Sequence, residues 1–349
     1  MLEGIHKIHL IGIGGSGMRA IANILIQKGY EVSGSDVKES DVIERFRKMG
    51  ATVHIGHNAD YVQGVDAVVR STAIREDNPE IVAAKEQGIT ILHRSDIVKA
   101  VLDVTNGIAV AGAHGKTSTT SMIGQILVEG QMEPTVIIGG EVDYLKGSSC
   151  LGKGEYSVVE ADESDGSFLK LRPKTIVITN IEDDHMDHYK TMENLLNAFC
   201  QFVETLPVDG KAVVCGDNDN IRYVMSKVER QFITYGLEES NDYVAKNIHY
   251  EDSSLVYDVV RKGETLSRVS LRVPGNHNVL NSLASFIVAH ECCHVPVPSI
   301  VKALGKFIGA KRRFETKGHV AGVWVVDDYA HHPTAVSYTH LTLPTTERV

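Results

Sequence analysis

Short apolar runs alternate with amphipathic stretches along the first hundred residues. The apolar runs predict strands at residues 7–13, 30–36, 51–56, 66–72 and 90–94. Between them, residues 18–28 and 41–49 carry apolar side chains at helical spacing and predict helices. Regular alternation of strand and helix indicates a parallel sheet covered by helices. We therefore expect an N-terminal α/β domain.

The same pattern starts again near residue 106. Strands are predicted at 106–112, 156–162, 174–181 and 211–215, and a helix at 193–206. Residues 242–273 alternate in a way that predicts antiparallel strands at a sheet edge, and 277–290 predict a helix entered through Pro274 and Gly275. The pattern indicates a second α/β domain with a mostly parallel sheet.

The pattern changes after Lys311. Residues 313–336 resemble the start of a further α/β domain, with a strong strand at 323–326, whereas 337–349 have no helical or strand period. A third domain of ordinary size would need on the order of 100 more residues. We interpret 313–336 as the beginning of such a domain and 337–349 as a non-native tail.

Composition narrows the class of protein. The 349 residues are 43% apolar and 23% charged, with a net charge of −10, which argues against a general nucleic-acid binder. The chain has no signal-peptide pattern at its start and no run of 18 apolar residues, so we expect a soluble, cytoplasmic protein without a membrane span. Five cysteines without a CxxC pair predict reduced thiols.

A glycine-rich loop follows the first predicted strand. Gly12, Gly14 and Gly17 form G-x-G-x-x-G, with Gly15 inside the motif and Asp36 at the end of the next strand. Such a loop brings backbone amides close to a diphosphate, and the acid typically binds a ribose. Alone, the motif suits a nicotinamide-dependent dehydrogenase or merely a tight turn, and it does not identify the diphosphate ligand.

A second glycine-bearing loop follows the strand at 106–112. It consists of Gly112, Ala113, His114, Gly115, Lys116 and Thr117. The loop is similar to a P-loop, in which amides cradle phosphates, the lysine reaches the β- and γ-phosphates and the hydroxyl binds Mg²⁺. The general pattern G-x-x-x-x-G-K-[ST] would need glycine at position 110, which is valine here, so the pattern is not met. The loop from Gly112 is two residues shorter.

Acidic residues follow two later strands. The strand at 156–162 ends with Glu160 and Asp162, and Glu163 and Asp165 follow it. After the next strand, residues 183–188 add three aspartates and two histidines. Carboxylates at the carboxyl ends of parallel strands beside a phosphate loop are placed to hold Mg²⁺. A solvated acidic loop explains most members of the second group equally well.

Six motifs then occur in an order that is similar to the Mur ligase family, and to its alanine-adding branch in particular. They are GIGGSGM, GAHGKTS, EADESDGSF, TNIEDDHMDH, GNHNVLNSLAS and DDYAHHP. The resemblance extends from residue 5 to about residue 334. Single motifs of this kind are weak, but six in order are specific.

The resemblance implies an ATP- and Mg²⁺-dependent, amide-forming ligase of peptidoglycan synthesis. A Rossmann-like domain at 1–104 would hold the UDP part of UDP-N-acetylmuramate, and a P-loop-type domain at 105–312 would bind ATP. The lactyl carboxylate would be phosphorylated to an acyl phosphate, which the amine of L-alanine would then attack. Catalysis of this kind is mainly positioning and neutralisation of charge.

The resemblance also assigns roles to residues. Lys116, Glu160 and His185 are the implied catalytic residues, and Thr117, Glu160 and His185 the implied Mg²⁺ ligands. The implied ATP-binding residues are Gly112, Ala113, His114, Gly115, Lys116, Thr117, Ser118, His277, Asn278, Asn281, Arg313 and Asp328. The implied substrate-binding residues are Gly12, Gly14, Gly15, Gly17, Asp36, Ser164, Asp165, Tyr329 and His331.

Three other functions compete with this interpretation. A dehydrogenase would leave the second phosphate loop and the acidic strand ends unexplained. A ligase that adds a tripeptide in cell-wall recycling fits GIGGSGM and DESDGSF less well. A non-catalytic nucleotide-binding module is the third, and because the last domain is only begun, we expect this chain to bind its substrates but to turn over weakly. The sequence predicts no oligomeric state.

Overall fold

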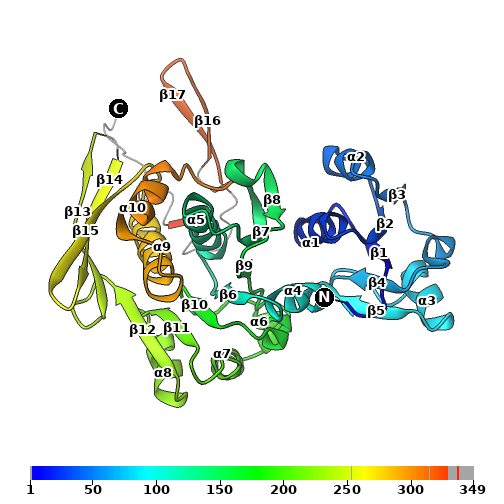
Figure 1. Ribbon diagram of the computed structural model, residues 1–349, viewed down its shortest axis with the longest axis horizontal. Coiled ribbons are helices and arrows are strands. Elements are labelled where there is room, and N and C mark those ends of the chain that lie inside the picture. Colours follow the sequence, from blue (N-terminus) through cyan, green and yellow to red (C-terminus); the bar gives the residue numbers. More distant parts are fainter. Residues whose placement is uncertain (1, 253, 314, 329–335, 338–349) are drawn as a thin grey trace.

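The computed structural model contains two separate β-sheets and a projecting hairpin, and it describes residues 2–252, 254–313, 315–328 and 336–337. Figure 1 shows the five-stranded sheet at one end of the long axis and the antiparallel strands β13 to β15 at the other. The hairpin of β16 (Glu315–Val320) and β17 (Val323–Asp327) projects away from both sheets (Figure 1).

The first sheet is entirely parallel, with strand order β3-β2-β1-β4-β5. Its strands are β1 (Lys7–Ile11), β2 (Glu31–Asp36), β3 (Thr52–Ile55), β4 (Ala67–Arg70) and β5 (Thr90–His93). Its helices are α1 (Ser16–Gln27), α2 (Asp41–Lys48), α3 (Pro79–Glu86), α4 (Arg94–Leu102) and the 3₁₀ turn Ala59–Val62. The doubly wound topology puts the loops that follow all five strands at one edge.

The second sheet has ten strands in the order β15-β14-β13-β12-β11-β10-β6-β9-β7-β8. The strands are β6 (Asn106–Ala111), β7 (Thr135–Val142), β8 (Gly147–Cys150), β9 (Tyr156–Glu160), β10 (Thr175–Ile178), β11 (Lys211–Cys215), β12 (Gln231–Gly236), β13 (Tyr243–Glu251), β14 (Ser254–Arg261) and β15 (Glu264–Leu271). The strands from β13 to β7 run parallel, while β14, β15 and β8 are antiparallel at the two edges.

Helices connect these strands. They are α5 (Lys116–Glu129), α6 (Met186–Tyr189), α7 (Met192–Glu204), α8 (Asp219–Lys227), α9 (Asn276–Ile287) and α10 (Val297–Lys306), with 3₁₀ turns at Asp143–Leu145 and Ser167–Lys170 and a π-helical turn at Val288–Cys292. α5 is buried on almost all sides, which fits its position between the sheet, α9 and α10.

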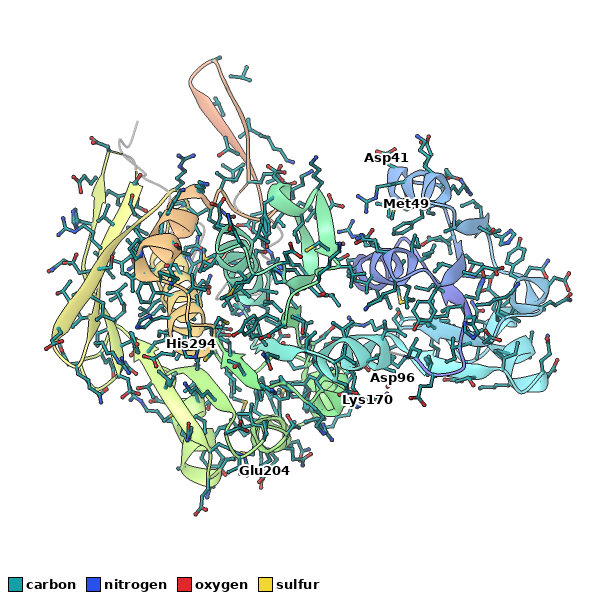
Figure 2. All side chains as sticks on the ribbon, viewed as in Figure 1. Asp41, Met49, Asp96, Lys170, Glu204 and His294 are labelled. Carbon is teal, nitrogen blue, oxygen red and sulfur yellow. The ribbon has the colours of Figure 1, made fainter. Side chains whose placement is uncertain are left out.

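The apolar core is continuous from one sheet to the other. One cluster of buried side chains includes Ile8 of β1, Leu102 of α4 and Ile108 of β6. α1 packs against both α4 and the β7–β8 pair. In the first turn of α4, Asp96 accepts a hydrogen bond from Lys170 at 2.9 Å, and both side chains are labelled in Figure 2. Helices α1 and α4 of the first domain therefore pack on the second sheet, and both sheets share one apolar core.

The structure confirms the α/β class, the mostly parallel second sheet and the antiparallel edge predicted at 242–273. Several strands end earlier than predicted. β1 stops at Ile11, because the amides of Gly12 and Ile13 both turn to the carbonyl oxygen of Ser35. The predicted strand at 90–94 ends at His93, since His93 and Asp96 form a capping box that starts α4.

The prediction of one helix over 277–290 was incomplete. The α-helix runs over Asn276–Ile287 and continues as a π-helical turn to Cys292. No helix of the described residues is long and apolar enough to cross a membrane. All five cysteines are free, as predicted.

Candidate active site

A large cleft lies where the carboxyl ends of strands from both sheets meet. Its volume is about 1370 Å³. The lining residues come from the loops after all five strands of the first sheet and after β6, β9, β10, β11 and β12 of the second. Open parallel sheets bind ligands outside the carboxyl ends of their strands. The fold thus places binding loops on both walls of one cleft.

The first glycine loop joins β1 to α1 on one wall. Gly12 adopts φ of +72°, which a residue with a side chain rarely adopts. The amide of Gly15 donates to the carbonyl oxygen of Gly12 and closes the turn. α1 then begins at Ser16 without a side-chain cap, so its first amides remain available to an anion. Gly12, Gly14, Gly15 and Gly17 all line the cleft, and their role in substrate binding stays a prediction.

Asp36 lies beside this loop, and both of its carboxylate oxygens already accept backbone hydrogen bonds. Gly14 N donates to Oδ2 at 2.9 Å, and Val37 N donates to Oδ1 at 2.8 Å. Asp36 therefore fixes the shape of the loop. Its predicted contact with a ribose stays a prediction.

The third glycine of the motif makes room for an arginine that the sequence analysis missed. A Cβ atom on Gly17 would lie 2.9 Å from Nη1 of Arg94. Arg94 forms an ion pair with Asp162, which follows β9 in the second sheet. Burial would raise the pKa of Asp162, but Arg94 and hydrogen bonds from Ser164 lower it to about 2. Arg94 thus joins the two walls of the cleft.

The second glycine loop follows β6, and close packing dictates its glycines. A Cβ atom on Gly112 would lie 2.3 Å from Oγ1 of Thr179, and one on Gly115 would lie 2.5 Å from Oδ1 of Asn281. Gly112 and Gly115 also adopt φ of +128° and +84°. The loop is held in a form that leaves no room for side chains at these positions.

Asn180, after β10, orients this loop through both ends of its amide group. His114 N donates to Asn180 Oδ1 at 2.9 Å, and Asn180 Nδ2 donates to the carbonyl oxygen of His114 at 3.0 Å. The motif TNIEDDHMDH contains Asn180, but its acids and histidines were the residues predicted to act, and the role of Asn180 was missed.

Lys116, the first residue of α5, folds back over its own loop. Its Nζ donates to the carbonyl oxygen of Gly112 and to Oε1 of Glu163, each at 2.5 Å. Burial would lower the pKa of Lys116, but the adjacent Glu163 carboxylate outweighs burial and raises it. The ammonium is therefore charged where a phosphate would lie. Glu163, only 2% exposed, was predicted as one of the acids placed to hold Mg²⁺, but in the structure it pairs with Lys116.

Glu160 and Thr117 form the candidate Mg²⁺ site. Oε1 of Glu160 is shielded from solvent and accepts no hydrogen bond from any described residue. Burial raises the pKa of Glu160, against hydrogen bonds from Gly139 and Thr117. A buried carboxylate oxygen without a donor beside a hydroxyl suits a hard cation, and Mg²⁺ typically takes one or two carboxylates plus substrate phosphates. These residues fit the ion.

His185 does not join that pair directly. Its Nε2 lies 3.7 Å from Oε1 of Glu163 and 3.6 Å from Oδ2 of Asp184, and its strongest interaction, with Glu163, raises its pKa. No group of three or more His, Cys, Asp or Glu side chains converges as a metal site in the described part of the chain. The structure therefore brings Thr117 and Glu160 together, whereas His185, the third implied Mg²⁺ ligand, contacts Glu163 and Asp184, and its role as a ligand stays a prediction.

The start of α9 forms the far end of the second wall. His277, Asn278 and Asn281 all line the cleft. Burial lowers the pKa of His277 to about 4, although Asp328 opposes the shift. Asn281 Oδ1 accepts a hydrogen bond from Thr119 and so ties α9 to α5. The two asparagines are buried and the imidazole is neutral at pH 7.

Of the remaining predicted site residues, six line the cleft, one does not, and two lie outside the described residues. Ala113, His114, Ser118, Ser164, Arg313 and Asp328 line the cleft. Arg313 donates to Oγ1 of Thr117 at 3.5 Å. Asp165 does not line the cleft, because its carboxylate accepts the amide of Ser167 and lies 3.5 Å from His93. Tyr329 and His331 lie outside the described residues.

Comparison with family models matches two segments of this chain. Residues 7–104 match the Mur ligase family catalytic domain, and residues 110–289 match the Mur ligase middle domain.

Individual relatives agree with these matches. The chain is 45% identical over 334 residues to a UDP-N-acetylmuramate–L-alanine ligase of Desulfatibacillum aliphaticivorans, which covers 96% of this chain and 73% of the relative. It is 44% identical to the enzyme of the same name from Geobacter sulfurreducens, over 97% of this chain and 73% of that one.

Two solved structures are also similar. The UDP-N-acetylmuramate–alanine ligase of Thermotoga maritima superposes with a TM-score of 0.86 at 31% identity, over 96% of this chain and 77% of that one. A UDP-N-acetylmuramate:L-alanyl-γ-D-glutamyl-meso-diaminopimelate ligase of Neisseria meningitides gives 0.82 at 27% identity, over 88% of this chain and 100% of that one. The likeness includes both walls of the cleft.

Proposed function

The chain belongs to the Mur ligase family, and from that premise we propose that it joins L-alanine to UDP-N-acetylmuramate with consumption of ATP. The observation that carries the proposal is the cleft, in which two different phosphate-binding loops face a common space. An enzyme that phosphorylates one nucleotide-linked substrate with another nucleotide needs such an arrangement.

The first loop would hold the diphosphate of UDP-N-acetylmuramate. The uncapped start of α1 supplies amides for an anion, and Arg94 adds a positive charge beside Gly17. We propose residues 1–104 as the domain that binds the UDP part and residues 105–312 as the domain that binds ATP. The muramyl group would extend from α1 toward Ser164 on the opposite wall.

The second loop would hold the phosphates of ATP. Lys116 is already charged and lies against Glu163, so it needs only to redirect its ammonium toward the β- and γ-phosphates. Thr117 and Glu160 would hold one Mg²⁺. When bound, that ion neutralises charge that develops on the transferred phosphoryl group. The resemblance to the family also implies a second Mg²⁺, and we propose His185 as one of its ligands.

The reaction would proceed in two steps. A lactyl carboxylate oxygen attacks the γ-phosphorus of ATP, ADP departs, and an acyl phosphate forms. The uncharged amine of L-alanine then attacks the acyl carbon, inorganic phosphate leaves with its bonding electron pair, and the nitrogen loses one proton to the solvent. Lys116 donates hydrogen bonds to the phosphoryl oxygens in the first step.

Two observations favour this function over its alternatives. A dehydrogenase would not need the P-loop, and the relatives named as alanine ligases are more similar to this chain than the solved tripeptide-type ligase. Addition of L-alanine is therefore preferred to addition of a tripeptide.

Product formation tests the proposal. The chain is incubated with ATP, Mg²⁺, UDP-N-acetylmuramate and L-alanine, and the products are read by mass spectrometry, which also detects slow turnover. We expect the alanyl product in equal amount to ADP, and no ADP above background when UDP-N-acetylmuramate is omitted. Preferential use of a tripeptide over L-alanine would contradict the assignment of the amino acid.

A further inference from the structure

A carboxylate is fully buried in the wall of the first sheet, outside the machinery described above. Glu80 follows Pro79 at the start of α3 and has an exposed fraction of 0%. Oε2 accepts a hydrogen bond from Ser35 Oγ at 2.7 Å and lies 3.2 Å from His9 Nε2. Oε1 lies 3.1 Å from His57 Nδ1 and 3.3 Å from the amide of Asn58.

These contacts determine which atoms carry protons. Burial would raise the pKa of Glu80, but hydrogen bonds from His9, Ser35 and His57 outweigh it and lower the pKa. An ionised carboxylate can only accept hydrogen bonds. Therefore His9 donates through Nε2 and His57 donates through Nδ1, a tautomer assigned from the network.

His57 differs from the other members of this network because it reaches the cleft. Its side chain is 22% exposed and lines the cleft, whereas His9 and Glu80 are completely buried. With Nδ1–H donated to Glu80, the uncharged form of the ring would present Nε2 as an acceptor. Within the described residues, no hydrogen bond or ion pair engages Nε2 of His57.

The location of His57 indicates which part of a ligand it would meet. It follows β3, two strands away from β1, whose loop leads into the uncapped start of α1. Phosphates at α1 would leave the nucleoside to extend across the sheet toward β2 and β3. Asp36, at the end of β2, already accepts Gly14 N and Val37 N. His57 Nε2 is thus a polar atom at the cleft that no hydrogen bond or ion pair of the described residues engages.

We propose that Glu80 is a positioning residue, which holds His57 so that its Nε2 accepts a hydrogen bond from the nucleoside of the UDP substrate. The donors available on that nucleoside are a ribose hydroxyl and uracil N3–H. The proposal rests on the proposed function and names the residues that recognise one part of its substrate. Loss of Glu80 would free the imidazole to rotate and to exchange tautomers, without removing any atom that touches the ligand.

A double-mutant cycle separates positioning from a merely structural role. The affinities for UDP-N-acetylmuramate and for ATP are measured by calorimetry in the wild-type chain, His57→Ala, Glu80→Gln and the double variant. We expect each single change to weaken UDP-N-acetylmuramate binding roughly three- to tenfold, as for loss of one hydrogen bond. The double variant should bind no more weakly than His57→Ala, and ATP affinity should stay unchanged throughout.

His54→Ala is the matched control. His54 lies three residues before His57, stacks on Tyr61 at a ring distance of 3.9 Å and does not line the cleft. It should leave the affinity for UDP-N-acetylmuramate unchanged.

The contrary results are distinct. If Glu80→Gln weakens binding equally with and without His57, Glu80 acts through the general structure and the proposal is wrong. Unchanged affinity in His57→Ala would also overturn it.

Should Glu80→Gln fail to fold, the affinities of the wild-type chain and of His57→Ala for UDP, 2′-deoxy-UDP and CDP are compared. Loss of discrimination against the deoxy form assigns the ribose, loss against CDP assigns the base, and unaltered discrimination with unaltered affinity overturns the proposal. No binding of UDP-N-acetylmuramate by the wild-type chain would instead refute the proposed function.

Discussion

Lys116, which is partly buried, forms an ion pair with the buried carboxylate of Glu163 at the second glycine loop. Nζ lies 2.5 Å from Oε1, and the other carboxylate oxygen of Glu163 has no hydrogen-bond donor among the described residues. Removing one partner of a buried pair leaves an uncompensated charge, which is strongly destabilising. The pair therefore keeps the ammonium charged while no phosphate is bound.

Lys116→Met should weaken ATP binding at least tenfold, because it removes a charged donor to the phosphates. It should also lower the unfolding midpoint, since Glu163 loses its partner. Adding Glu163→Gln should restore much of the stability but none of the ATP affinity, as measured by calorimetry and thermal unfolding. Lys170→Met, on the exposed pair with Asp96, is the control and should change neither quantity. Unchanged ATP affinity in Lys116→Met would remove this residue from phosphate binding.

His277 should make stability depend on pH in a definite direction. Burial lowers its pKa in the folded chain to about 4 from an ordinary value of 6.5. Between these values the unfolded chain binds a proton that the folded chain does not, so stability falls as pH falls from about 6.5 toward 4. Above that window the residue contributes no slope.

His277→Gln should therefore lose this part of the acid sensitivity. Its stability relative to the wild-type chain should improve on going from pH 7 to pH 5, by on the order of 1–2 kcal/mol. Thermal unfolding at both pH values measures the change, with His249→Gln at a half-exposed position as the control. An equal difference between wild type and His277→Gln at the two pH values would show that His277 titrates normally.

At the scale of elements, the two loops derive their shape from neighbours rather than from their glycines alone. Thr179 and Asn281 occupy the space where Cβ atoms of Gly112 and Gly115 would lie, and Arg94 occupies that space at Gly17. Each loop is therefore built by packing against a distant segment of the chain.

Gly115→Ala should disturb both backbone and packing. The residue has φ of +84°, and a Cβ atom would lie 2.5 Å from Asn281 Oδ1. Gly64→Ala is a matched control, because Gly64 has φ of +72° but no atom within 4 Å of its Cβ position. The control should lose about 1–2 kcal/mol from the left-handed backbone alone. Gly115→Ala should lose more and bind ATP at least tenfold more weakly, whereas equal effects of the two changes would show that packing at Asn281 is unimportant.

The elements also show what the sequence could predict. Regular apolar spacing identified α1, α2 and the parallel strands, because their buried faces contain apolar residues only or nearly so. α3 was missed, since it buries Glu80 at a position where a helix pattern requires an apolar residue. The residue that disrupts the pattern is the one to which we assign a role in substrate positioning.

Only those site residues whose motif itself indicates a chemical role could be predicted from the sequence. Lys116 and Thr117 follow from the loop, whereas Glu160 was singled out from the neighbouring acids only by the resemblance to the family. The structure brings the three residues together. Arg94 could not be predicted, because its partners Gly17 and Asp162 are distant in sequence. Asp165 resembles a cleft residue in sequence, but its local turn directs it to His93.

At the scale of the whole molecule, polar contacts hold the two walls of the cleft together. Arg19 of α1 pairs with Glu141 of β7 at 2.9 Å, and Asn23 donates to the carbonyl oxygen of Ser149 at 3.0 Å. These two contacts connect α1 to the second sheet, and the ion pair of Arg94 with Asp162 connects the start of α4 to it. The two nucleotide loops are thereby fixed at opposite walls of one space.

The central claim is that this single cleft binds a uridine nucleotide sugar and ATP at the same time, at different loops. Calorimetric titration of UDP-N-acetylmuramate into the chain, with and without saturating ATP and Mg²⁺, tests it most directly. We predict one site for each ligand, no competition between them, and no binding of NADH. Competition of UDP-N-acetylmuramate with ATP for one site, or binding of NADH in its place, would contradict the account.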